Sequence, residues 1–581
     1  MPASAARLGW ALLATAAVAL PLLTANTYYL YLACCVGLLT IVTAGLNVLA
    51  GFTGQISLGH AGFYALGAYG AALGVTRLGW PAWLGVISGL GLAAAVGAAV
   101  AGAALRVSGP YLAMVTIAFG IIVESVLIEW IAVTGGPGGV FNIPKPSIQV
   151  SYWIIVAVAA LSLWLIANLR RSAWGRGFLA VKGSEVAAES LGLSAYYLRI
   201  VAFTVSAAFA GVAGALFAFL NGYISPDSFT LQNSIVFLLA LLFGGLGSTA
   251  GPVIGSLALT VLPELLTGLS DYRLMLYGVL LLASTYWLPS GVVGAVARWM
   301  GDRRAGPSPC PLPEGERDHG RSEQRDEASL LTVEGVSIAF GGVVALSDVS
   351  VSVAAREVHA VIGPNGAGKT TLLNLLSGYY TPERGRIQLA GRSIVGRPPY
   401  AVARLGVART FQTAQLFPDL TVAENVGVGV SGPRLGSLLA ALVGAPSSRR
   451  RERELRSRAL ALLEPSDLAA RAEQPAEALP AGLRRQLEIA RALATAPRLL
   501  MLDEPAAGLG PAEIEALDAQ VTTLRNGGGP AIILVEHHMD LVMAVSDRIS
   551  VLDYGRVIAR GSPASVRDNA AVVEAYLGAP A

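Results

Sequence analysis

The sequence predicts an all-α polytopic membrane domain of about eight to ten helices, fused to a soluble α/β domain. The chain has 581 residues, a mean hydropathy of +0.59 and only 14% charged residues, whereas soluble chains are about a quarter charged. Residues 1–300 carry only 11 of the 41 Lys/Arg residues and 7 of the 38 Asp/Glu residues. The first half therefore has the composition of a membrane protein, and the second half that of a soluble protein.

Composition also divides the chain into domains. We expect a membrane domain over residues 1–299, a flexible linker over 300–329 that is rich in proline and charge, and a second domain over 330–581, where β-branched runs alternate with helical stretches. The three cysteines, at positions 34, 35 and 310, indicate no disulfide framework. No metal-ligand spacing occurs.

Apolar runs define the expected membrane spans. About 20 apolar residues are needed to cross about 30 Å of hydrocarbon, and the candidates are 8–25, 28–50, 56–76, 82–105, 110–130, 151–169, 200–221 and 273–290. A signal peptide is the alternative for 8–25, but a second apolar run follows at once, so we interpret it as an uncleaved span. The glycine-rich segment 232–268 either crosses twice or enters and leaves on one side, which leaves eight and ten spans open.

The charge of the loops predicts the topology. The polar loop 169–199 contains five basic residues, and positively charged loops stay in the cytoplasm. Six spans before this loop then place the N-terminus in the cytoplasm as well. An even number of later crossings returns the C-terminal domain to that side.

Polar and glycine-rich positions inside the spans have two interpretations. Non-helical backbone at membrane depth needs a protein or water-lined covering, so the interruptions Gly51–Gly62 and Gly244–Gly255 either line a pathway or, as we favour, allow close packing through small residues. A carboxylate at mid-membrane costs roughly 2.5–3.5 kcal/mol, so Glu124 should face the bundle interior, while Glu129 can reach the interface. We interpret His60 as a packing residue.

A phosphate-binding motif follows the predicted strand 358–363. It matches G-x-x-x-x-G-K-[ST] in the required context of strand, loop and helix. Glycine lets backbone N–H groups turn toward phosphate oxygens, and the helix start adds its positive dipole end. We expect Lys369 to neutralise phosphate charge and Thr370 to bind Mg²⁺. The nucleotide-binding run is Gly363, Pro364, Asn365, Gly366, Ala367, Gly368, Lys369, Thr370 and Thr371.

A second motif, Leu499–Glu504, ends a buried strand with two carboxylates. In α/β sheets, ligands bind at the carboxyl ends of the strands. We expect Asp503 to hold Mg²⁺ through water and Glu504 to act as the general base on the attacking water. Together, the two motifs predict a nucleotide hydrolase.

Several stretches of the first half resemble the membrane subunits of branched-chain amino acid importers. They are 54–61 (GQISLGHA), 111–119 (YLAMVTIAF), 134–139 (TGGPGG), and 221–229 together with 244–252. The resemblance runs over most of residues 30–290 and is to permeases of the LivM type, whose relatives also serve urea and other small amides or acids.

The second half resembles the ATPase subunits of ABC transporters, and over residues 331–578 those of the LivG type. The resemblance implies that Gln412 senses the γ-phosphate and Mg²⁺, that His537 contacts the γ-phosphate and that Phe340 stacks on adenine. The alternative for Phe340 is a core position. The basic stretch 449–458 contains interleaved glutamates, so it predicts a solvated helix and no binding of nucleic acid.

The signature motif of the ABC family is degenerate in this chain. It falls on Leu479, Pro480, Ala481, Gly482 and Leu483, so that proline replaces the usual serine and leucine the usual glutamine. In this family the signature of one ATPase closes over nucleotide bound to the other. The resemblance therefore implies an asymmetric pair, in which the site built on Lys369 hydrolyses ATP.

The cytoplasmic loop 169–199 contains a segment that resembles the part of importer permeases that docks on the ATPase. Its marker residues are Glu185, Ala187, Ala188 and Gly192, with Val186 at the place of the usual glutamate. We expect a short amphipathic helix that lies in a groove of the ATPase. The alternative is an ordinary solvated loop.

Taken together, the resemblances imply an ATP-driven importer of the cytoplasmic (inner) membrane. Its implied partners are a second, LivH-like permease, a second, LivF-like ATPase, an extracytoplasmic substrate-binding protein and membrane lipid; a homodimer remains possible. Branched-chain amino acids are the expected substrate, with urea or a short amide as the alternative. An exporter half-transporter and an ATP-gated channel are the other functions considered.

Overall fold

The computed structural model describes residues 15, 17–24, 26–105, 109–265, 329–464 and 466–577, and isolated positions between 275 and 295. Half of the predicted span 8–25 and most of the predicted span 273–290 lie outside these residues, and so does almost all of the predicted linker. Among the described residues, six helices are long and apolar enough to cross a membrane. They are Thr27–Phe52, Ala82–Ala104, Tyr111–Glu129, Ile148–Arg170, Ala195–Asn221 and Pro226–Gly244.

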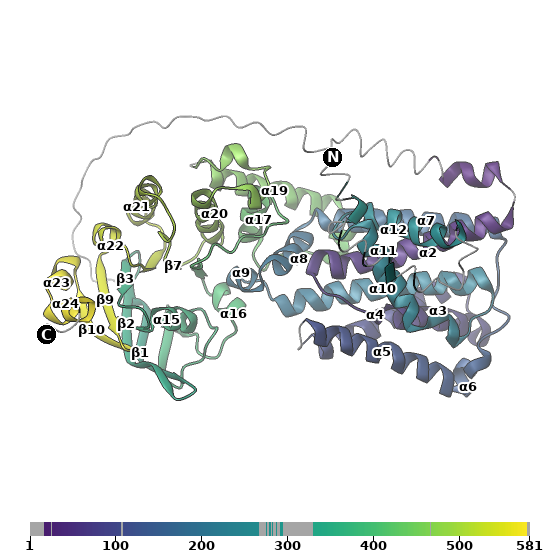
Figure 1. The fold of residues 1–581 in the computed structure, drawn as a ribbon, viewed down its shortest axis with the longest axis horizontal. Coiled ribbons are helices and arrows are strands. Elements are labelled where there is room, and N and C mark those ends of the chain that lie inside the picture. Colours follow the sequence, from purple (N-terminus) through teal and green to yellow (C-terminus); the bar gives the residue numbers. More distant parts are fainter. Residues whose placement is uncertain are drawn as a thin grey trace. The chain divides into compact units, whose positions relative to one another are not determined.

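The first compact unit is a helical bundle formed mainly by residues 15–171 and 196–265 (Figure 1). This confirms the predicted all-α membrane domain. The helices are α2 (Thr27–Leu46), α3 (His60–Leu78), α4 (Ala82–Ala104), α5 (Pro110–Glu129), α6 (Ile131–Thr134), α7 (Ile148–Arg170), α10 (Ala195–Asn221), α11 (Leu231–Gly244) and α12 (Gly251–Leu265). Shorter turns are η1 (Asn47–Phe52), a π-helix, and the 3₁₀ turns η2 (Gly136–Gly138) and η3 (Pro226–Phe229).

Glycines let three of these helices approach each other at backbone distance. A Cβ added at Gly67 of α3 would lie 2.1 Å from the Gly211 carbonyl oxygen of α10, and one at Gly89 of α4 would lie 2.5 Å from the Gly67 oxygen. Helix association in a membrane depends on this kind of close packing, because lipid tails are as apolar as the side chains. Small residues are therefore required where α3, α4 and α10 meet.

The two glycine-rich interruptions also pack closely, and they contact each other. A Cβ at Gly51 would lie 2.6 Å from the Gly247 nitrogen. The buried Asn47 donates from Nδ2 to the Ser248 carbonyl oxygen at 2.8 Å and accepts the Gly247 N–H at 2.8 Å. One amide side chain thus satisfies two backbone groups of the break between α11 and α12. This arrangement agrees with the packing interpretation of both interruptions.

The segment 232–268 forms a helical hairpin as far as it is described. Its arms α11 and α12 have 14 and 15 residues and pack together, so each is roughly 21–23 Å long at 1.5 Å per residue. The arm α12 alone is shorter than a typical hydrocarbon core, whereas α11 and the preceding turn η3 together form the 19-residue candidate span Pro226–Gly244. Of this segment, residues 266–268 lie outside the described residues.

Three polar residues in the spans have distinct surroundings. His60 is fully buried, with Nδ1 3.0 Å from the Ser57 hydroxyl and Nε2 2.7 Å from the Ser206 hydroxyl. Its ring therefore serves as a hydrogen-bonded packing element between α3 and α10. Glu124 is half-buried on α5, and Glu129 is exposed at the end of that helix.

The second compact unit contains two sheets and includes Ser172–Ala195 from the first half of the chain. The antiparallel sheet has the order β2-β1-β4-β5, and the larger sheet the order β10-β9-β3-β8-β7-β6. All pairings of the larger sheet are parallel except β9 with β10. The strands are β1 (Ser329–Phe340), β2 (Val343–Ala354), β3 (Val358–Ile362), β4 (Arg384–Leu389), β5 (Arg392–Ser393), β6 (Val407–Arg409), β7 (Leu499–Asp503), β8 (Ala531–Val535), β9 (Arg548–Asp553) and β10 (Arg556–Gly561).

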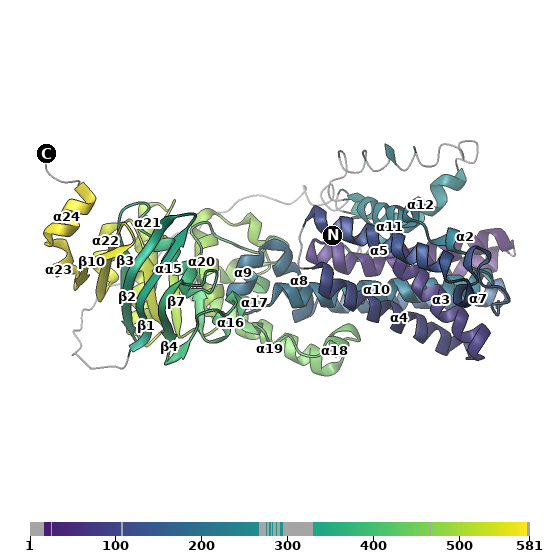
Figure 2. The same cartoon turned by 90° about the horizontal axis from the view of Figure 1, so that it is seen from below.

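Helices complete this unit and confirm the predicted α/β class (Figures 1 and 2). Leucines of α15 share one apolar core with β1, β2, β4 and five strands of the larger sheet, β3, β6, β7, β8 and β9. The helices are α8 (Ala173–Gly183), α9 (Glu185–Ser190), α15 (Lys369–Leu376), α16 (Pro399–Arg404), α17 (Val422–Ser431), α18 (Leu438–Leu442), α19 (Pro446–Leu463), α20 (Ala481–Leu493), α21 (Pro511–Asn526), α22 (Met539–Val545), α23 (Pro563–Arg567) and α24 (Ala570–Leu577), with 3₁₀ turns η5 (Ala469–Arg471) and η6 (Ala476–Ala478).

The Asn47 contacts generate a prediction for the membrane domain. Asn47→Ala should lower the free energy of unfolding of the purified chain in detergent by about 1–3 kcal/mol, because the N–H of Gly247 and the carbonyl of Ser248 lose their partner. Thr76→Ala is the control, since this exposed hydroxyl bonds only within its own helix. Equal thermal denaturation of the two variants would contradict the prediction.

Candidate nucleotide site

The phosphate loop (residues 363–368) begins where β3 ends, at the carboxyl end of the larger sheet. Every residue of β3 is buried, and the chain then turns through Gly366 at φ +83° and Gly368 at φ +101° into α15. These angles lie in the left-handed region that favours glycine. A Cβ at Gly366 would meet no atom within 4 Å, so the loop leaves an open cradle.

Lys369 lies at the start of α15, and its side chain folds back over the phosphate loop. The buried ammonium donates to the carbonyl oxygens of Gly363 at 2.7 Å and Pro364 at 3.0 Å. Burial lowers the pKa of Lys369, while the carboxylates of Glu504 and Asp503 oppose this shift. Asn365, Gly366 and Thr370 are exposed around the loop, and Thr371 is half-buried. A glycine-rich loop with exposed residues at a helix start, beside a lysine, fits a polyphosphate.

Glu504 lies directly after β7 and is held between two side chains. Gln412 donates from Nε2 to one carboxylate oxygen at 2.8 Å, and Nε2 of His537 lies 3.1 Å from the other. The Glu504 backbone has a φ of +45°, a conformation that is uncommon for residues other than glycine, and its N–H donates to the Val535 carbonyl oxygen at 2.8 Å. The structure thus brings together Glu504, the expected general base, and the two residues expected to contact the γ-phosphate.

Asp503 has a partner that the sequence analysis missed. Arg409, the last residue of β6, donates from one terminal nitrogen to Asp503 Oδ2 at 2.8 Å and from the other to Asn374 Oδ1 at 2.7 Å. The Arg409 and Asp503 side chains are 4% and 5% exposed. The sequence did contain one sign of this pair: Arg409 is a single charged residue at the end of an apolar strand, and a buried charge requires a partner.

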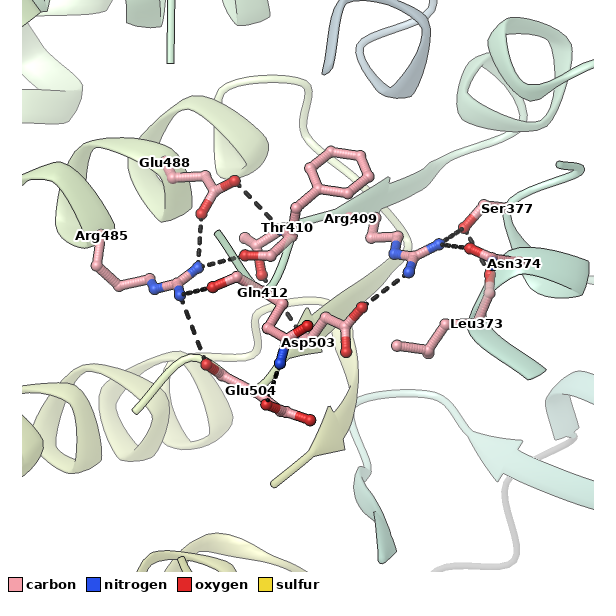
Figure 3. A network of polar contacts seen from close by, with 11 residues as sticks. Leu373, Asn374, Ser377, Arg409, Thr410, Gln412, Arg485, Glu488, Asp503 and Glu504 are labelled. Atoms are coloured by element: carbon pink, nitrogen blue, oxygen red, sulfur yellow. Dashed lines mark hydrogen bonds and ion pairs between the residues drawn. The ribbon is translucent and has the colours of Figure 1, made fainter. Parts of the chain in front are cut away.

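A second buried pair fixes the loop that carries Gln412 (Figure 3). Arg485 of α20 donates to the carbonyl oxygens of Phe411 at 2.6 Å and Gln412 at 2.7 Å, and it pairs with Glu488 at 2.8 Å. Glu488, which is fully buried, accepts the N–H groups of Phe411 and Gln415, both at 3.2 Å. Burial raises the pKa of Glu488, and nearby arginine charges oppose that shift.

A third buried carboxylate, Glu536, precedes His537. It accepts the N–H of Ala506 at 2.6 Å, of His537 at 2.9 Å and of His538 at 3.3 Å. Glu536 therefore ties the segment after Glu504 to the segment that carries His537. The signal for it was an acidic residue at the end of the buried strand β8.

The predicted base-stacking and signature residues are positioned as follows. Phe340 is 44% exposed at the end of β1, with its ring 5.0 Å from that of Tyr380, so it is not a core residue. Leu479 is buried, and Pro480 is the N-cap of α20, the helix that carries Arg485 and Glu488. The first turn of that helix contains Ala481, Gly482 and Leu483. A Cβ at Gly482 would lie 1.9 Å from Glu513 Oε1.

Segment 185–192 packs within the same compact unit as the phosphate loop. Its helix α9 begins at Glu185 and contacts α16, and Ala187 and Ala188 are fully buried. The Gly192 carbonyl oxygen accepts a hydrogen bond from Arg404 Nε at 3.0 Å. Tyr379, which follows α15 closely, donates its hydroxyl to the Val186 carbonyl oxygen at 2.9 Å.

Comparison with known families agrees with both halves of the chain. The family described as the permease component of branched-chain amino acid transport systems matches residues 28–285, and the ABC transporter family matches 346–507. A third family, described as branched-chain amino acid ATP-binding cassette transporter, matches 556–581.

Individual relatives cover each half separately. The ATP-binding protein LivG of Salmonella typhimurium, named for high-affinity branched-chain amino acid transport, is 45% identical over 249 residues, which are 43% of this chain and 98% of LivG. The permease LivM of Escherichia coli is 36% identical over an alignment of 285 positions, and the match covers 44% of this chain and 67% of LivM. A solved nucleotide-free ATP-binding cassette is 32% identical, covers 43% of this chain and all of its own, and has a TM-score of 0.38.

The Arg409 contacts generate a prediction for this site. Arg409→Gln should lower the free energy of unfolding by about 3–5 kcal/mol, because it leaves the buried Asp503 carboxylate without its charge partner. Chemical denaturation of the purified chain measures the effect. Arg384→Gln, at an exposed position of β4, provides the control, and a shared denaturation midpoint for the two variants would refute the prediction.

Proposed function

The chain belongs to the branched-chain amino acid ABC transporter family, with a permease and an ATP-binding component in one polypeptide, and we propose that it imports branched-chain amino acids by hydrolysing ATP. The observation that carries this proposal is the placement of Glu504 between Gln412 and His537, in a unit that also contains segment 185–192. One compact unit then contains both Glu504, which would activate the attacking water, and segment 185–192, the part of the permease that would respond to ATP binding and hydrolysis.

The ATP phosphates would lie in the phosphate loop. The open space at Gly366 and the exposed Asn365 and Thr370 leave the loop accessible, and the positive end of α15 points toward it. Lys369 already lies against this loop, so its ammonium can exchange backbone carbonyls for β- and γ-phosphate oxygens. Phe340, exposed at the end of β1, offers its ring to the adenine base.

The proposed metal is Mg²⁺, which prefers oxygen ligands. The Thr370 hydroxyl and the Gln412 side-chain oxygen would provide two of them, and the Asp503 carboxylate would hold the metal through water. When bound, the metal would neutralise charge that develops on the phosphates. Glu504 would take the proton from the attacking water as general base, and its hydrogen-bond partner His537 would also contact the γ-phosphate.

Segment 185–192 is proposed to be the docking segment. Tyr379 and Arg404 bind its backbone from the ATPase side. Gln412 is fixed by Arg485, so a change at the nucleotide can shift the loop 410–415 together with α20 and its neighbours. This supports transmission of the nucleotide state to the permease, with α8 and α9 moving together with the surface of the ATPase.

The relatives support the proposed assembly and location. An ABC import system has partner subunits, and we propose a second, LivH-like permease, a second, LivF-like ATPase and an extracytoplasmic substrate-binding protein. We propose that the ATPase domain lies in the cytoplasm. The loop 169–199 is basic, basic loops stay in the cytoplasm, and most of this loop belongs to the same compact unit as the ATPase. The families and relatives on both halves favour branched-chain amino acid import over urea import, export or channel gating.

The role of Glu504 can be tested directly. Glu504→Gln in the complex with its partner subunits should lower ATP turnover roughly 10²–10⁴-fold, because a general base is lost, and uptake of labelled leucine should stop while ATP binding persists. Glu515→Gln, an exposed glutamate of α21, should behave as the parent chain. Undiminished leucine uptake by Glu504→Gln would exclude hydrolysis at this site as the driving reaction.

The degenerate signature motif generates a second test. Pro480→Ser restores the usual hydroxyl and also places a preferred N-cap residue, worth about 1 kcal/mol, at the start of α20. If the signature of this chain closes over nucleotide bound to the partner ATPase, ATP turnover by the assembled complex should rise. Unchanged turnover would show that the two sites are not made asymmetric by Pro480.

A further inference from the structure

Helix α8, which precedes the docking segment, is bound to the ATPase by a contact of its own. It joins α9 through Ser184 and packs against α17, and its residues from Ala173 to Val181 are all buried. Trp174 donates from Nε1 to the Gly436 carbonyl oxygen at 3.1 Å. The docking segment is therefore one part of a larger interface within this compact unit.

The carboxylate of Glu452, on α19, makes two bonds to the first turn of α8. One oxygen lies 2.6 Å from a terminal nitrogen of Arg176, and the other accepts the N–H of Ala173 at 2.7 Å. The first N–H groups of a helix have no partner within the helix, and its N-terminus favours negative charge. One side chain thus satisfies a helix end and a guanidinium at the same time.

The surroundings distinguish Glu452 from other glutamates on α19. The side chains of Arg176 and Glu452 are 10% and 21% exposed. Two residues further along, Glu454 pairs with Arg450 on the surface, where the two side chains are 57% and 79% exposed. Exposed pairs contribute little to stability, whereas removing one partner of a buried pair leaves an uncompensated charge. The stretch 449–458 is therefore solvated in part but not at Glu452.

We propose that Glu452 is a positioning residue that latches α8, and with it the docking segment, to the ATPase of the same chain. The inference rests on the proposed docking role of segment 185–192, and it adds a second point of attachment outside that segment. Because the latch binds the helix leading into the docking segment, its loss should let segment 185–192 leave the ATPase surface.

The experiment measures how often the docking segment is exposed. Ser190 is 8% exposed, so Ser190→Cys in the full-length chain, held in native membranes, should react slowly with a maleimide. The labelling rate of Cys at position 190 is obtained by subtracting the labelling of a chain that keeps Ser190 and contains only the native cysteines. The test variants are Glu452→Gln and, from the permease side of the contact, Arg176→Gln. The matched control is Glu454→Gln, the same chemical change on the same helix.

Glu452→Gln and Arg176→Gln should each raise the labelling rate roughly tenfold, as expected when a hydrogen bond to a charged group is lost, and Glu454→Gln should leave it unchanged. The variant that carries both substitutions should label no faster than Glu452→Gln alone, because each substitution removes the same contact, the ion pair between Arg176 and Glu452. Three results would overturn the latch. Glu452→Gln could label as slowly as the parent, Glu454→Gln could label as fast as Glu452→Gln, or the effects of Glu452→Gln and Arg176→Gln could add in the double variant, which would indicate general destabilisation.

The test separates the latch from the proposed function, since labelling requires no transported substrate. Fast labelling of Glu452→Gln supports the latch even if the assembled complex takes up no leucine, a result that would count against the function alone. Fast labelling of the parent Ser190→Cys chain would show that the segment does not dock, and it would overturn both.

Discussion

The buried pair of Arg485 and Glu488 is the interaction on which the site depends. The loop 410–415 follows β6 and belongs to no strand, so its buried backbone groups need hydrogen-bond partners from elsewhere. Glu488 accepts two N–H groups of this loop, and Arg485 binds two of its carbonyls. Only with the loop fixed in this way does the Gln412 side chain reach Glu504. The pair therefore fixes the position of Gln412, the proposed γ-phosphate sensor.

The same pair connects three parts of the ATPase that carry separate functions. Arg485 and Glu488 belong to the helix that begins at the signature residues, and Gln412 binds the carboxylate at the end of β7. Close to this network, Arg409 binds both Asp503 and Asn374 of α15, the helix that starts at Lys369. In a buried polar network of this kind, the loss of one member leaves the others without partners, which is costly at low dielectric. The proposed coupling of bound nucleotide to segment 185–192 would pass through these contacts.

Local patterns in the sequence predicted the parts of the site that depend on local geometry. The phosphate loop follows from glycine spacing after a buried strand, and Asp503 and Glu504 from their position at a strand end. Gln412 and His537 came from family resemblance. Arg409 and Glu452 were missed because their partners are distant: Arg409 and Asp503 are 94 positions apart, and nothing in either local sequence specifies the other. Glu536 binds two neighbouring N–H groups, but its third partner, Ala506, is 30 positions away. The sequence at the start of α8 likewise does not indicate that Glu452 of α19 binds the first turn of this helix.

Active accumulation of substrate tests the central claim most directly. The chain and its partner subunits would be reconstituted in liposomes, with the substrate-binding protein and labelled leucine outside and either ATP or a non-hydrolysable analogue inside. The account predicts that internal leucine rises above the external concentration with ATP and not with the analogue. Equilibration to the external concentration with either nucleotide would contradict it, and would indicate a nucleotide-gated channel instead of a hydrolysis-driven importer.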